Sequence, residues 1–129
     1  MTGSNHPPVL KDLDRSHPVP GAWRLPLSEI VHAFVVGDYA LSAGVVGVEP
    51  VNDKTASQIR SCISEYGATL TELPDETWRT SVVQWYGEHW DFLVDLWTLQ
   101  EGHSDLVLSG RVVEIGDGYS FEVHLVYVP

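Results

Sequence analysis

The first half of the chain holds two stretches in which apolar residues recur at the three- and four-residue spacing of an amphipathic helix. The first stretch begins at Pro26, a residue favoured in the first turn of a helix, and runs to about Gly37 or Asp38. Its apolar positions are Leu27, Ile30, Val31 and Phe34. This spacing predicts a helix with one face turned toward a core.

The second helical stretch begins at Asn52 or Asp53, residue types that cap the first turn of a helix through their side chains. Gly67 is placed to end this helix, because glycine accepts the left-handed conformation common just after the last turn. The apolar face of this helix carries Ile59, Cys62, Ile63 and Tyr66. Two helices are therefore predicted before residue 68.

From residue 68 onward apolar and polar residues alternate with the period of two that is typical of strands. The alternating stretches are ATLTEL, as a short strand, followed by TSVVQWY, WDFLVDLWTL, DLVLSGRVVEI and YSFEVHLVYV. Short turns between successive strands favour antiparallel pairing.

Three turns set the expected register: Gly87-Glu88, a loop at residues 100–104, and Asp117-Gly118. They place the following pairs opposite one another: Trp85 with Trp90, Leu96 with Leu108, and Arg111 with His124. All three turns assign the same residues to one apolar face, which a slip of one residue would reverse. That face carries Val83, Trp85, Trp90, Phe92, Val94, Leu96, Leu108, Val112, Phe121, Val123, Leu125 and Tyr127.

An apolar sheet face requires a covering layer, and the two helices are the available elements. The sequence therefore predicts an α+β fold, a four- or five-stranded antiparallel meander with two N-terminal helices packed on one face.

The opposite face of this sheet is predicted to carry the chemistry. Its residues are Gln84, Asp91, Leu93, Asp95, Trp97, Val107, Ser109, Arg111, Val113, Glu122, His124 and Val126. In the expected register Arg111 has Leu93 on one side and His124 on the other, with three carboxylates on the diagonals. One interpretation is a polar site, in which Arg111 binds an anionic group and His124 exchanges a proton. The other is a solvated face whose opposite charges pair with little effect on stability.

Trp97 is expected on this face among the charged residues, a composition typical of interaction surfaces. Glu101, His103 and Asp105 follow in the loop at the end of the face and are further candidates for partner contact. Their alternating spacing is a weak metal pattern, and Ser104 beside His103 and Asp105 lacks the geometry of a hydrolase triad. A turn role, with Gly102 at a positive φ, is the simpler interpretation. We therefore expect no metal and no cofactor.

Composition limits the function classes. The chain has 129 residues and a formal net charge of −11, which opposes nucleic-acid binding because phosphates require clustered cations. No apolar run is long enough to span a bilayer, and no secretory signal is recognised, so we expect a cytoplasmic protein. The single Cys62 cannot form an internal disulfide. Prolines cluster near the start of the sequence, and we expect residues 1–22 to form a mobile arm before one domain at 23–129.

The stretches IVHAFVVGDYAL, EYGATLTELPDETW and LVDLWTLQEGHSDLVL, with a closing YVP, resemble an uncharacterised family of short bacterial proteins, a domain of unknown function. The resemblance covers about residues 23–129 and implies a bacterial, stand-alone domain with no assigned activity. A helix ending in Gly-Asp-Tyr before a long terminal meander is also similar to the nuclear-transport-factor-like fold, which implies a curved sheet around a ligand pocket.

Two functions of different class follow. The first is a non-enzymatic binding module, for example an immunity-type protein, that holds a basic protein partner on the second sheet face. The alternative is a small-ligand-binding protein or enzyme with a pocket on the curved sheet, lined by Arg111, His124 and Asp95 if that face is covered. Exposed apolar residues on the same face also allow a homodimer.

Overall fold

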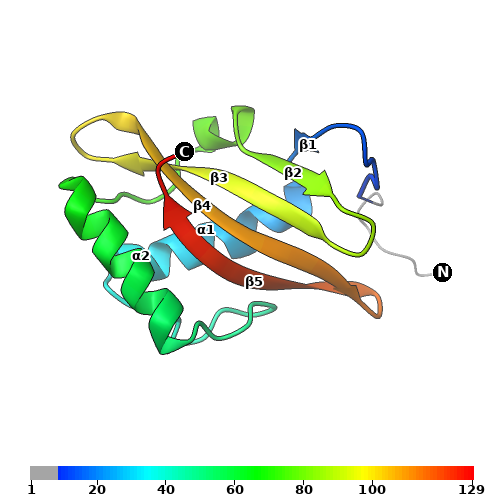
Figure 1. Cartoon of the computed structure of the whole chain (residues 1–129), viewed down its shortest axis with the longest axis horizontal. Helices are drawn as coiled ribbons and strands as arrows, with labels where there is room; N and C mark the ends of the chain where they lie inside the picture. The colour runs from blue at the N-terminus through cyan, green and yellow to red at the C-terminus, as the bar shows by residue number, and fades with distance from the viewer. Residues whose placement is uncertain (1–8) are drawn as a thin grey trace.

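The computed structural model describes residues 9–129, which form an α+β fold around one antiparallel sheet (Figure 1). The elements are, in chain order, β1 (His17–Pro18), α1 (Gly21–Val35), α2 (Asp53–Tyr66), the short 3-10 helix η1 (Asp75–Arg79), β2 (Val82–Trp85), β3 (Trp90–Thr98), β4 (Gly102–Ile115) and β5 (Gly118–Tyr127). The strands lie in the order β1-β2-β3-β4-β5, so that each pairs with its neighbour in sequence. The predicted α+β class is confirmed.

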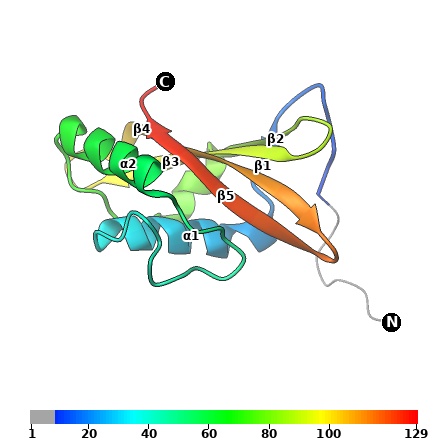
Figure 2. The ribbon, with the colours of Figure 1, turned by 60° about the horizontal axis from the view of Figure 1, so that its bottom comes forward.

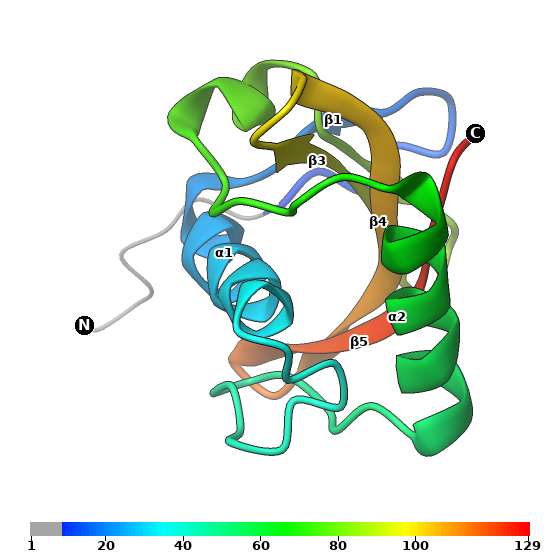
Figure 3. The ribbon, with the colours of Figure 1, turned by 90° about the vertical axis from the view of Figure 1, so that its left-hand side faces the viewer.

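The sheet curves around α1, which lies in its concave face (Figure 3). α1 begins before the predicted start at Pro26, because Trp23 stands one turn ahead of Leu27 and extends the same apolar stripe. Trp23, Leu27 and Phe34 are all buried in the core. Pro20, predicted to lie in the arm, directly precedes the helix, and Pro26, predicted to begin it, lies inside it.

α2 has the predicted ends. The side chain of Asn52 accepts a hydrogen bond from the backbone N–H of Thr55 at 2.8 Å, and Gly67 adopts the left-handed conformation at φ 81°. Ile59 and Ile63 on its inner face are buried. Neither helix of the described chain is long and apolar enough to cross a membrane.

The free edge of β5 is covered by two polar contacts from elsewhere in the chain. The Gln58 side chain of α2 donates to the Val126 carbonyl at 2.7 Å and accepts from the Val126 N–H at 3.2 Å, as a neighbouring strand would. Nearer the tip, the Phe121 N–H donates to the Gly47 carbonyl, and the Glu49 N–H donates to the Phe121 carbonyl. Covering an edge in this way blocks strand addition by other chains. Figure 2 shows α2 lying beside this strand.

The register of β2 and β3 is confirmed, with Trp85 opposite Trp90. The other two turns are each displaced from prediction. The β4–β5 turn is centred on Gly116 and Asp117, with Ile115 opposite Gly118, and the β3–β4 loop pairs Thr98 with Gly102. Through the middle of the sheet both displacements amount to two residues. Because side chains alternate with a period of two, the apolar face is unchanged.

A β-bulge near the end of β5 reverses the predicted facing of its last residues. Gly110 pairs with Val123, but the preceding Ser109 pairs with Leu125, so His124 is the extra residue. Beyond this bulge Val126 is fully buried, while Leu125 and Tyr127 are only half-buried. The prediction that Leu125 and Tyr127 face the core and Val126 faces away was therefore wrong. The alternation of apolar and polar residues does not predict a bulge, because the extra residue reverses which face of the sheet the following residues occupy.

The ATLTEL stretch also differs from the prediction of a short strand. It forms an isolated bridge of Leu70 to Thr98 instead of a strand, with the Thr71 N–H donating to the Trp97 carbonyl at 2.9 Å. Of the predicted arm, residues 1–8 lie outside the described residues. Residues 9–22 include β1 and the start of α1, and Val19 among them is buried.

Gly110 is the position at which the sheet tolerates no side chain. A Cβ there would overlap both the carbonyl oxygen of Glu122 and the ring of Phe92. We predict that Gly110→Ala lowers the free energy of unfolding by about 1–3 kcal/mol, as overpacking of a core does, measured by urea denaturation. Gly21→Ala is the matched control, because a Cβ at Gly21 meets nothing within 4 Å. Equal stability of the Gly110→Ala variant and the unchanged protein would contradict this account of the bulge.

Candidate functional site

The outer face of the sheet, the side turned away from α1, carries the predicted site residues. It faces the viewer in Figure 1, where no helix crosses β3, β4 or β5. The alternation along β3 places Asp91, Leu93, Asp95 and Trp97 on this face, each half-buried or exposed, between the buried positions. The face is therefore open and is not the lining of a covered pocket among the described residues.

A row of polar residues crosses the outer face from β2 to β5. In register, Gln84 lies opposite Asp91, Asp91 opposite Arg111, and Arg111 opposite Glu122. The predicted neighbours of Arg111, Leu93 and His124, were wrong because both flanking registers are displaced by two residues. The arginine consequently stands directly between two acids and not diagonally to them.

Each of these acids nevertheless contacts a histidine from its own part of the chain. Nε2 of His89 lies 3.1 Å from an oxygen of Asp91, and Nε2 of His124 lies 2.9 Å from an oxygen of Glu122. Arg111 forms no ion pair with any described residue, and its buried Nε has no hydrogen-bond acceptor there. Because the carboxylates beside it contact histidines and its side chain is only half-buried, the terminal part of the Arg111 guanidinium can pair with an acceptor from outside.

Trp97 and His103 form the second cluster of the outer face. Their rings stack with centroids 5.3 Å apart and planes inclined by 13°. Asp95 holds this cluster in place, because its carboxylate accepts a hydrogen bond from Thr80 and lies 3.4 Å from Nε2 of His103. The indole Nε1 of Trp97 is buried without an acceptor among the described residues. Trp97 and Arg111 thus each carry one buried donor without an acceptor among the described residues, beneath the outer face.

Of the predicted loop residues, only Glu101 lies in the turn, whereas His103 and Asp105 belong to β4, because β4 pairs with β3 as far as Gly102. Glu101 accepts a hydrogen bond from the hydroxyl of Tyr66 at 2.5 Å, and the same hydroxyl accepts from the backbone N–H of Asp105 at 3.1 Å. His103 turns instead toward Asp95. Glu101, His103 and Asp105 therefore do not converge on one point, and among the described residues no group of three metal-ligating side chains does. Gly102 has φ 74°, as the turn interpretation predicted.

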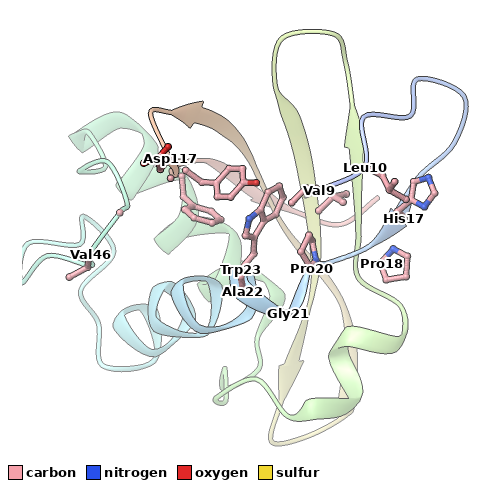
Figure 4. A pocket seen from close by; sticks show the side chains of 15 residues that line it. Val9, Leu10, His17, Pro18, Pro20, Gly21, Ala22, Trp23, Val46 and Asp117 are labelled. Carbon is pink, nitrogen blue, oxygen red and sulfur yellow. The ribbon is translucent and has the colours of Figure 1, made fainter. Parts of the chain in front are cut away.

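The sequence reading missed a separate cavity on the concave side, at the end of the sheet near the start of α1 (Figure 4). Its volume is about 960 Å³. Its lining includes Pro18, Pro20 and Trp23, which were assigned to the arm or its junction, together with Tyr119 and Phe121 of β5. The available signal was Trp23, a large aromatic residue at helical spacing from Leu27. None of the predicted site residues lines this cavity.

A family model described as a domain of unknown function, DUF7668, matches residues 31–129. The chain belongs to the DUF7668 family. The match includes every predicted site residue of the outer face, but it begins inside α1 and leaves out Trp23, Pro20 and β1. No curated protein matches the chain, and no solved structure does. The predicted domain family is thereby confirmed, and the similarity to the nuclear-transport-factor-like fold stays a prediction.

The contact between Tyr66 and Glu101 holds the β3–β4 turn at the end of the outer face. Its effect on the pKa of Tyr66 makes the contact measurable. Donation to the Glu101 carboxylate raises the pKa of the Tyr66 hydroxyl above its ordinary value, because the bond and the nearby negative charge favour the neutral phenol. We predict that Glu101→Gln lowers the pKa of the Tyr66 hydroxyl. An NMR titration of the Tyr66 ring measures this change.

The raised pKa of Tyr66 also sets the direction in which pH changes the stability of the fold. A folded-state pKa above the unfolded value contributes stability that is present below about pH 10 and lost as the pH rises through the folded pKa. Glu122→Gln is the control, because Glu122 pairs with His124. An identical Tyr66 titration in all three proteins would remove this contact from the description of the loop.

Proposed function

We propose that this chain is a non-enzymatic binding module that holds a basic protein partner on the outer face of its sheet. The observation that carries the proposal is an uncovered face on which Arg111 lies opposite Asp91 and Glu122 without an ion pair among the described residues. On the same face half-buried Trp97 stacks on His103. Trp and Arg are the residue types that most often dominate binding energy at protein interfaces. The contact residues are Asp91, Asp95, Trp97, Glu101, His103, Asp105, Arg111, Glu122 and His124.

Charge supports a basic partner. The formal net charge of the chain is −11, and Asp105 and Glu122 are exposed on this face beside half-buried Asp91. Clustered negative charge raises the rate at which a positively charged partner associates and discourages acidic ones. The histidines that now contact Asp91 and Glu122 are exchangeable neighbours, since lysine or arginine side chains of a partner would pair with the same oxygens.

The arrangement also supports binding over chemistry. The polar groups of the outer face lie opposite one another in a row that spans four strands, and none of them is among the described residues that line the cavity. Exposed Leu93 and half-buried Val113 and Leu125 lie among them and provide apolar contact area. Such a mixture of apolar and polar positions is typical of an interface that is not permanent.

Charge reversal tests the proposal. We predict that the triple variant Asp91→Lys, Asp105→Lys and Glu122→Lys loses capture of a basic protein that the unchanged protein recovers, at low salt, from an extract of its source cells. The control variant carries the same change of charge on exposed acids elsewhere, Glu29→Lys, Glu65→Lys and Glu88→Lys. Quantitative mass spectrometry of proteins retained by the three baits provides the measurement.

Three results are informative. Loss of one basic protein with the outer-face variant alone supports the proposal. Recovery of the same proteins by all three baits contradicts it. Loss with both variants shows that net charge acts without this face. Sedimentation of the purified chain tests whether a second copy of the chain occupies the outer face. A dimer that the outer-face variant disrupts would assign the face to that second copy and contradict the proposal of a basic partner.

A further inference from the structure

The cavity at the end of the sheet near the start of α1 belongs to no part of the proposed interface. It is bounded by the segment before β1, by the first turn of α1, and by the tip of the β4–β5 hairpin. In Figure 4 the indole of Trp23 rises from α1 with Val9 and Pro20 on one side and Asp117 on the other. Its volume of about 960 Å³ lies at the upper end of the range of small-molecule sites.

The inner wall of this cavity is a fixed aromatic cluster. Trp23 is 1% exposed and packs edge-to-face against Tyr119, Phe121 and Trp90, with ring centroids 5.2, 5.7 and 5.3 Å away. Rings held in this geometry are preorganised, so that a ligand packed against them does not have to order them first. The Nε1 of Trp23 is buried and has no acceptor among the described residues.

The charges of the lining restrict the ligand. Asp117 is the lining carboxylate, and the His17 ring lies 2.8 Å from an oxygen of Asp12 through Nε2. No lysine or arginine is among the described lining residues. An anionic ligand would therefore face a carboxylate and a strongly negative protein without a cation to bind it. The rest of the lining is aromatic, aliphatic, proline or glycine, which favours an uncharged body.

The entrance is apolar as well. Leu10 is 61% exposed and Val46 is 93% exposed, and both line the cavity. Val46 lies in the loop that reaches the edge of β5 through Gly47 and Glu49. Figure 4 shows Val46 and Leu10 at opposite ends of the cavity, so both ends of its rim are apolar.

From these observations we propose that the cavity binds an uncharged aromatic small molecule, packed against the half-buried Tyr119 ring and the aliphatic and proline side chains of the lining, over the aromatic cluster beneath them. The site lies on the opposite side of the sheet from the outer face, so it is independent of the partner-binding proposal. Each proposal can fail while the other holds.

A matched pair of fluorescent probes tests the ligand class. N-phenyl-naphthylamine is uncharged and aromatic, and anilinonaphthalene sulfonate has the same ring system with an added negative charge. We expect saturable one-to-one binding of the uncharged probe to the full chain, and binding of the sulfonate at least about tenfold weaker, a difference of about 1.4 kcal/mol. Equal affinity for both probes, or no saturable binding of the uncharged probe, would overturn the proposal.

Two substitutions locate the bound probe. Ala22 lines the cavity and is exposed, so Ala22→Phe fills the opening without disturbing the core, and we expect it to weaken the uncharged probe by about tenfold or more. Ala43→Phe is the control, because Ala43 is equally exposed and outside the lining. Asp117→Asn should strengthen binding of the sulfonate probe alone. Unchanged affinity of the Ala22→Phe variant, with its thermal unfolding intact, would place the probe elsewhere and reject this cavity.

Discussion

The close approach of β5 and Phe92 at Gly110 is the constraint on which the rest of the structure depends. The space that a side chain would occupy at Gly110 is taken by the Phe92 ring and the Glu122 carbonyl oxygen. The bulge at His124 begins at the same place. Glycine in a strand commonly marks such an approach, and a bulge increases the local twist and bend. The resulting curvature gives the sheet a concave side that accommodates α1 (Figure 3).

This curvature separates two surfaces of different character. The concave side carries the aromatic cluster of Trp23, Trp90 and Phe121, and the cavity lies beside this cluster at the end of the sheet near the start of α1. The convex side has no covering element among the described residues and presents the row of Asp91, Arg111 and Glu122. Aromatic packing and charge are therefore found on opposite sides of a single layer of strands.

The edge contacts maintain the separation. Gln58 pairs with both backbone groups of Val126, and the 47–49 loop pairs with Phe121, so the end strand of a curved sheet has few free groups for strand addition. The same loop carries Val46 to the rim of the cavity. A segment that covers the sheet edge therefore also shapes the entrance to the concave side.

Local chemistry in the sequence determined the two helices, the Asn52 and Gly67 ends of α2, the turn at Gly87 and the apolar face through the middle of the sheet. These features depend on residues close in sequence, and the facing survived two displaced registers because each displacement was two residues. Tertiary structure alone decided the neighbours of Arg111, the reversed facing of Val126, and the assembly of the cavity from β5 and the chain before α1. A bulge and a contact between distant segments depend on packing across the sheet. The alternation of residues along one strand therefore predicts neither of them.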